Sequence, residues 1–110
     1  MPPVPADYLQ GTLELIVLRT LSGGPMHGYA IARWIESATD SALTVEEGSL
    51  YPALYRMERR GWVDAEWGTS ELGRRAKFYR LTTAGRRQLA DGSAAWQAFS
   101  VTVGRLLKPA

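Results

Sequence analysis

The chain has 110 residues, of which 45% are hydrophobic and 22% charged, and a formal net charge of only +2, so we expect one cytoplasmic domain with a single modest core. The absence of cysteine excludes disulfides, thiolate metal sites and a cysteine nucleophile, and a single histidine excludes a multi-histidine metal site within one chain. No apolar run approaches the roughly 20 residues that a membrane-spanning helix needs, and the first residues lack the basic and apolar stretches of a secretory signal.

The first predicted elements are a disordered arm and a helix. Three prolines among residues 1–6 predict the arm. Asp7 and Gln10 have the spacing of a capping box, in which side-chain oxygens bind the free backbone N–H groups at a helix start. Apolar residues follow at helical spacing until the Gly-Gly-Pro sequence of residues 23–25, so we expect the first helix between these two signals.

Two further helices are predicted before the period of the sequence changes. The second runs from about Gly28 to Ala38, and the polar connector after it contains a candidate short strand at residues 43–45. The third starts near residues 48–49, and Gly61, directly after two arginines, is a typical residue to end it. Its inward stripe, spaced i, i+4, i+7, is Leu50, Leu54 and Met57. Its outward residues are then Ser49, Tyr51, Pro52, Ala53, Tyr55, Arg56 and Arg59.

A β-hairpin is predicted in the middle of the second half of the chain. Apolar and polar residues alternate over residues 62–67 and again over residues 76–81, which indicates two antiparallel strands. The segment between them, residues 68–75, is too long for a tight turn, so we expect an extended tip.

A long final helix is predicted from a cap at Thr82 or Thr83 to about Leu107. Apolar residues repeat every seven positions along it, as in the seam between two paired helices. We expect Leu89 to pack on its own domain, whereas the rest of the seam is too long for the core to cover. The predicted dimer interface, covered by a second copy of the chain, is Trp96, Phe99, Val103, Leu106 and Leu107. The alternative is that the helix folds back on the first helix.

The order helix, helix, helix, hairpin, helix predicts a mostly α fold with a small β-hairpin. This is the winged helix-turn-helix plan, followed here by a long C-terminal helix. In that plan the third helix enters the major groove of DNA, and the hairpin tip, or wing, contacts the backbone or the minor groove. We therefore expect a DNA-binding domain over residues 7–82 and a dimerisation helix over residues 83–110.

The residues at both places have the chemistry that DNA contact needs. Residues 1–55 carry a formal charge of −4 and residues 56–110 carry +6, which fits a polyanionic partner but equally a solvated surface with chance asymmetry. The candidate DNA contacts of the third helix are Ser49, Tyr51, Pro52, Tyr55 and Arg56. Those of the wing are Thr69, Ser70, Arg74, Arg75 and Lys77. The alternatives are that Tyr51 packs on a neighbouring helix and that the wing tip is merely solvated.

Several segments, taken in order, resemble the PadR family of bacterial transcriptional regulators. The resemblance covers about Leu9 to Leu107 and is carried by Gly24-Pro25-Met26-His27-Gly28-Tyr29, Glu47-Gly48-Ser49-Leu50-Tyr51-Pro52-Ala53-Leu54, Glu58-Arg59-Arg60-Gly61-Trp62-Val63, Arg75-Ala76-Lys77-Phe78-Tyr79-Arg80-Leu81-Thr82 and Ala84-Gly85. It implies a homodimer that binds double-stranded DNA and represses transcription at an inverted-repeat operator. The single C-terminal helix is similar to that of the short subfamily, in which this helix mediates dimerisation.

The resemblance also implies an effector and shows one departure. Some members of the family bind flat aromatic ligands between tryptophans of the two C-terminal helices. Trp96 is similar in place to such a residue and is the candidate contact for a small-molecule effector; the alternative is a tryptophan buried in the dimer core. At the wing tip, Leu72-Gly73 stands where related proteins carry polar residues such as Asn, and an exposed leucine there alters the tip contact.

An enzyme is the weaker interpretation of this sequence. His27 has no evident nucleophile to act with, and the adjacent Glu46 and Glu47 do not converge on one site. We predict no catalytic residues, no metal, no cofactor and no membrane partner. The stronger alternative is a winged-helix protein–protein interaction module that does not bind DNA. Binding to a random duplex that falls steeply with added salt distinguishes the two.

Overall fold

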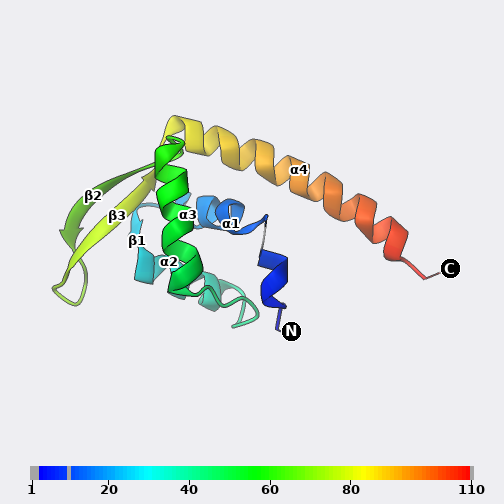
Figure 1. The fold of residues 1–110 in the computed structure, drawn as a ribbon, viewed down its shortest axis with the longest axis horizontal. Coiled ribbons are helices and arrows are strands. Elements are labelled where there is room, and N and C mark those ends of the chain that lie inside the picture. Colours follow the sequence, from blue (N-terminus) through cyan, green and yellow to red (C-terminus); the bar gives the residue numbers. More distant parts are fainter. Residues whose placement is uncertain (1–2, 10, 110) are drawn as a thin grey trace.

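Figure 1 shows short helices packed beside a narrow β-sheet, with a longer helix that extends away from them. The computed structural model describes residues 3–9 and 11–109. Its elements in chain order are the 3-10 helix η1 (Ala6–Leu9), α1 (Leu13–Leu21), β1 (Met26–His27), α2 (Gly28–Ala38), α3 (Glu47–Arg59), β2 (Val63–Thr69), β3 (Arg75–Leu81) and α4 (Thr83–Leu107). This order confirms the predicted fold class, a winged helix-turn-helix with a long C-terminal helix.

The segment before α1 is only partly described. Of the arm predicted over residues 1–6, the first two residues lie outside the described residues, as does Gln10 of the predicted capping box. Further along the arm, the N–H of Val4 donates a hydrogen bond of 2.8 Å to the carbonyl of Ala42. This bond joins the arm to the connector between α2 and α3.

The first α-helix begins at Leu13, so the prediction that it begins near Asp7 is wrong. A single 3-10 turn lies there instead, and Gly11, with φ of +83°, separates that turn from α1 in a conformation that a helix does not allow. Thr12 precedes the helix without capping it, because its hydroxyl donates to the carbonyl of Tyr8 at 3.0 Å.

The sheet contains a strand that the sequence does not reveal. Met26 pairs with Tyr79 across the antiparallel β1–β3 ladder, and the strand order is β1-β3-β2. Two residues are too few to show an alternating pattern, so β1 is visible only in three dimensions. The strand predicted at residues 43–45 is wrong: that stretch is irregular, and Val45 is buried as part of the core cluster without pairing to a strand.

The β2–β3 hairpin is longer and tighter than predicted. Its antiparallel register runs from Val63 opposite Leu81 to Thr69 opposite Arg75. The tip is therefore residues 70–74 rather than residues 68–75, because the pairing continues past the end of the alternating pattern. Figure 1 shows this hairpin projecting from the helical body.

The core forms where α1, α2 and α3 meet the sheet. Its largest fully buried side chains include Leu18, Ile31, Leu50, Leu54 and Met57, which confirms the inward stripe predicted for α3. One prediction for this helix is wrong, since Ala53 is fully buried rather than outward. It lies three residues after Leu50 and four before Met57, so it belongs to the same buried stripe.

The last helix starts on the domain and then leaves it. The Thr82 side chain caps α4 by accepting the Gly85 N–H at 3.0 Å. A Cβ on Gly85 would lie only 2.0 Å from the carbonyl oxygen of Trp62, so the first turn of α4 packs directly on the backbone before β2. Leu89 packs against the core as predicted. Beyond it the helix extends the molecule to 56 × 29 × 22 Å (Figure 1).

Candidate nucleic-acid interface

Helix α3 presents three polar faces around its buried stripe. Successive residues are about 100° apart around a helix, which places Tyr55 and Arg59 opposite the core. Tyr51 lies on the flank that faces the wing, whereas Ser49 and Arg56 lie on the flank that faces α1. The candidate residues of this helix therefore do not share one surface.

The outward face of α3 carries an aromatic ring and a cation in contact. Tyr55 is 61% exposed, and the guanidinium carbon of Arg59 lies 5.7 Å from the centroid of its ring. Pro52 lies on the same exposed side, in the second turn of the helix. Arg59 is absent from the candidate DNA contacts named above, although its spacing of four residues from Tyr55 is a usable signal.

Tyr51 is packed on one side and open on the other. Its ring lies across the start of α2, where a Cβ on Gly28 would come within 2.7 Å of the ring carbon Cε1 and the hydroxyl. The side chain is still 44% exposed. The two interpretations of Tyr51, packing on a helix and facing a ligand, are thus compatible in this structure.

An open hollow of about 670 Å³ lies between the wing and the start of α2, and we call it the wing cleft. Most of its lining side chains are aromatic rings and cations, and they come from β1, α2, α3 and both strands and the tip of the wing. Its main lining side chains are His27, Tyr29, Tyr51, Trp67, Leu72, Arg74, Arg75 and Lys77. The start of α2, one flank of α3 and the wing therefore meet on one surface of the molecule.

The wing tip is a hydrogen-bonded turn rather than a loose loop. The N–H of Ser70 donates to the carbonyl of Arg74 at 2.7 Å, and the N–H of Arg74 donates to the Ser70 hydroxyl at 3.3 Å. Ser70 thus helps to hold the turn, and Thr69 ends β2 as an exposed residue opposite Arg75. Leu72 at the tip is mostly exposed, as expected for a leucine that stands where related proteins carry polar residues.

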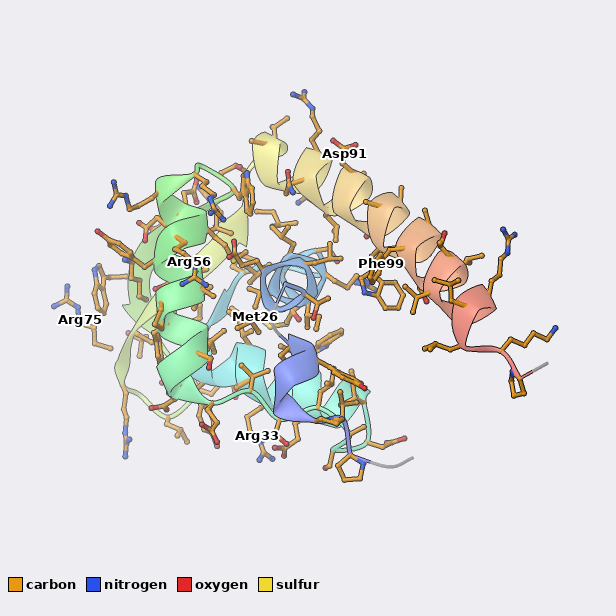
Figure 2. The ribbon with its side chains drawn as sticks, turned by 45° about the vertical axis from the view of Figure 1, so that its right-hand side comes forward. Met26, Arg33, Arg56, Arg75, Asp91 and Phe99 are labelled. Atoms are coloured by element: carbon orange, nitrogen blue, oxygen red, sulfur yellow. The ribbon has the colours of Figure 1, made fainter. Side chains whose placement is uncertain are left out.

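The guanidinium of Arg75 on the wing lies over an aromatic ring. Arg75 places its guanidinium carbon 4.6 Å from the ring centroid of Trp67, which is 58% exposed. Figure 2 shows Arg75 pointing away from the body of the molecule. Neither Arg74 nor Arg75 takes part in an ion pair among the described residues. Trp67, which the predicted contacts omit, is therefore part of this surface.

Lys77 differs from the arginines of the wing because it has a partner within the chain. Its ammonium lies 3.0 Å from the carboxylate of Glu58 on α3, and this hydrogen bond raises the pKa of Lys77. The same ammonium lies 5.5 Å from the ring of Tyr79. Burial raises the pKa of that phenol. Lys77 thus ties the wing to α3 at the base of the wing cleft.

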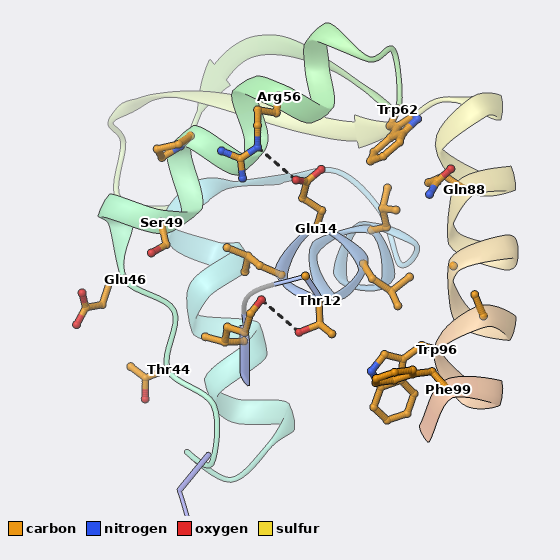
Figure 3. A pocket seen from close by; sticks show the side chains of 18 of the residues that line it. Thr12, Glu14, Thr44, Glu46, Ser49, Arg56, Trp62, Gln88, Trp96 and Phe99 are labelled. Carbon is orange, nitrogen blue, oxygen red and sulfur yellow. Dashed lines mark hydrogen bonds and ion pairs between the residues drawn. The ribbon is translucent and has the colours of Figure 1, made fainter. Parts of the chain in front are cut away.

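Arg56 is likewise held within the chain, on the flank of α3 that faces α1. Its Nε lies 3.3 Å from one carboxylate oxygen of Glu14, and Arg60 places Nη1 2.7 Å from the other (Figure 3 draws the first of these pairs). Glu14 was not singled out in the sequence, because 42 residues separate it from Arg56. The pair lies outside the wing cleft, on the far side of α3.

A second hollow, of about 1100 Å³, lies between α1, this flank of α3 and α4; we call it the α4 groove. Figure 3 shows Glu14 and Arg56 on one side of it and Trp96 and Phe99 of α4 on the other. Trp96 is 47% and Phe99 66% exposed in the single chain. Farther along α4, Val103 is half-buried and Leu106 and Leu107 are mostly exposed, so the apolar seam lacks a cover within the described chain.

The sequence and the architecture are similar to those of known transcriptional regulators. The model of the transcriptional regulator PadR-like family matches residues 17–91. A transcriptional regulator of Clostridium thermocellum has a structure similar to the chain, with a TM-score of 0.85 at 27% identity over 94% of this chain and 100% of that one. A PadR-like regulator of Bacillus cereus has a TM-score of 0.80 at 30% identity over 96% and 100%. A transcriptional regulator of Mycobacterium tuberculosis is 28% identical over 77% of this chain and 76% of its own.

Two broader conclusions follow for the chain. The matched family consists of transcriptional regulators rather than of enzymes. In the described part of the chain, none of the helices combines the length and the apolar character that crossing a membrane requires.

Proposed function

Since the chain belongs to the PadR-like family of transcriptional regulators, we propose that it is a sequence-specific repressor that binds an inverted-repeat operator as a homodimer. The observation that carries this proposal is the wing cleft. Tyr51 of α3 lines it together with Arg74 and Arg75 of the wing. The helix α3, which is the proposed reading helix, and the wing therefore face the same side of the molecule.

In the proposed complex, α3 lies in the major groove with Tyr55 and Arg59 toward the bases. The exposed tip of the wing then reaches the neighbouring backbone, where Arg74 and Arg75 neutralise phosphates. Phosphate contacts fix the register and orientation of the protein, whereas the α3 contacts provide sequence specificity.

The proposed dimer rests on the uncovered seam of α4. The helix has 25 residues and is therefore about 37 Å long, far longer than the part that packs on its own domain. A twofold-related copy that covers Trp96, Phe99, Val103, Leu106 and Leu107 removes these apolar side chains from water. It also places the winged domains of the two copies, which we call the two reading heads, on one face of the duplex, as an inverted repeat requires.

An effector is the further part of this proposal. The indole of Trp96 borders the α4 groove beside the proposed dimer seam, and a flat aromatic ligand that stacks on it would alter how the two copies pack. A different spacing of the reading heads would then release the operator. If Trp96 belongs only to the dimer core, ligands of this kind leave operator binding unchanged.

The proposal is tested by titrating the protein with a random duplex and with the region upstream of its own gene over a salt series. We expect affinity for both duplexes to fall steeply with salt, because binding releases phosphate counterions. We also expect footprinting to detect two protected half-sites upstream. A salt-insensitive or absent interaction with DNA contradicts the proposal and favours a winged-helix module that binds another protein.

A further inference from the structure

Glu14 of α1 is shared by Arg56 of the proposed reading helix and by Arg60, the residue that directly follows that helix. Arg56 pairs with one carboxylate oxygen at 3.3 Å and Arg60 with the other at 2.7 Å. The glutamate side chain is only 25% exposed, whereas both arginine side chains are about half exposed. One carboxylate is therefore shared by two neighbouring cations that remain open to solvent.

This shared carboxylate differs from the ion pairs made by residues of the sheet. There, Lys77 pairs with Glu58 and Arg80 with Asp64, so each cation has a carboxylate of its own. Two arginines on one carboxylate leave an excess positive charge on the α1 flank of α3. Exposed ion pairs contribute little to folding stability, so these arginines can exchange one anion for another at small cost.

The flank that carries Arg56 and Arg60 is where a DNA backbone would run. A helix with its side chains is about 10–12 Å across, and the major groove is about 12 Å wide. When α3 fills that groove, its two flanks lie beside the two phosphate backbones. The wing flank faces one of them, and the flank with Arg56 and Arg60 faces the other.

We propose that Glu14 is an internal competitor of DNA phosphate. In the free protein it holds Arg56 and Arg60, and on a duplex one or both arginines pass from the carboxylate to backbone phosphates. Glu14 thereby determines how much of the affinity is independent of sequence. This inference rests on the proposed function, because it requires α3 to bind DNA.

The first test compares Glu14→Gln with the unsubstituted chain on a random duplex, by fluorescence anisotropy over a salt series. We expect binding about threefold tighter or more at ~0.1 M salt, and a steeper dependence of log K on log[salt], by about 0.9 for each added phosphate contact. Phosphate contacts carry no sequence information, so operator affinity increases by the same factor. The matched control is Glu46→Gln, which removes an equal charge from the α4 groove, from a residue outside the ion pairs of the described chain.

The second test repeats Glu14→Gln in a chain that also carries Arg56→Ala and Arg60→Ala. The inference predicts no gain there, because no arginine is left to release. An equal gain in both backgrounds overturns it, since general repulsion or an altered dimer would act in both. No gain in the unsubstituted background, or an equal gain from Glu46→Gln, overturns it as well.

These outcomes are distinct from a failure of the proposed function. If the unsubstituted chain does not bind the duplex in a salt-dependent way, the repressor proposal is contradicted and this inference with it. If the unsubstituted chain binds normally and only the effect of Glu14→Gln is missing, the repressor proposal stands and this inference alone is wrong.

Discussion

Among single residues, two cations of the proposed DNA surface that form no ion pair within the described residues lie on aromatic rings. Arg59 lies over Tyr55 on α3, and Arg75 lies over Trp67 on the wing. A ring holds a guanidinium by attraction to its face and leaves the N–H donors around the edge free. Such an arginine is oriented before DNA arrives, whereas an arginine held by a carboxylate must first exchange its partner.

The Trp67 ring provides a direct test of this orientation. We expect Trp67→Ala to weaken binding to random and operator duplexes by about two- to fivefold, which corresponds to the 0.5–1 kcal/mol of an exposed cation–π contact. Trp67→Phe keeps a ring and should lose less. In a chain that already carries Arg75→Ala, Trp67→Ala should have no further effect. An undiminished loss in that background would mean that the indole itself contacts DNA.

The close contact between Gly28 and Tyr51 can be tested by adding one methyl group. We expect Gly28→Ala to lower the free energy of unfolding by about 1–3 kcal/mol, because the new methyl group overlaps the phenol ring. Thermal and urea denaturation measure this loss. In a Tyr51→Ala background the same change should be neutral or stabilising, since alanine is the better helix former by up to ~1 kcal/mol. An equal loss in both backgrounds would contradict this account of the close approach.

At the scale of elements, the sequence predicted what periodicity and end signals encode. The bounds of α2, the cap of α4 at Thr82 and the two long strands are all local patterns, and the structure has each of them. Contacts between distant segments leave no such pattern. The two-residue β1 depends on its pairing with β3, and the Glu14 pairs join α1 to the end of α3.

The same distinction holds for the candidate DNA contacts. Residue type and helix position identified Tyr55 and the wing arginines as exposed groups of the right chemistry. They did not reveal that Arg56 and Lys77 have carboxylate partners, because those partners are supplied by other elements. Nor did they reveal Trp67 as a platform for Arg75, since that contact depends on the strand register.

The wing as an element is tested by replacing Arg74 and Arg75 together with alanine. If both neutralise phosphates, affinity for random and operator duplexes falls alike, and the slope of log K against log[salt] becomes shallower by up to about 1.8. The control is Arg86→Ala with Arg87→Ala, which removes equal charge from exposed positions on α4. Equal effects of the two pairs would mean that only net charge matters. A loss confined to the operator would mean that the wing reads bases.

In the molecule as a whole, the proposed DNA surface and the proposed dimer seam lie on different parts of the structure. The winged domain gathers its aromatic and cationic side chains around the wing cleft, and α4 carries the uncovered apolar seam away from it. Figure 1 shows the free end of α4 far from the hairpin. A partner that binds the seam therefore leaves the reading surface open, so pairing and DNA contact are compatible in one assembly.

Pairing through the seam is tested by the double change Trp96→Ala and Phe99→Ala. Truncating two large apolar side chains should shift the protein from dimer to monomer in sedimentation velocity, because apolar burial is the main force that joins such helices. Operator binding should then weaken strongly, since a monomer loses the second reading head and the gain in effective concentration that comes with it. Val101→Ala is the control, because Val101 is exposed on α4 outside the predicted seam. A double variant that remains dimeric would refute the assignment of the seam, and a monomer that binds the operator as tightly as the parent would refute the two-headed reading of the DNA.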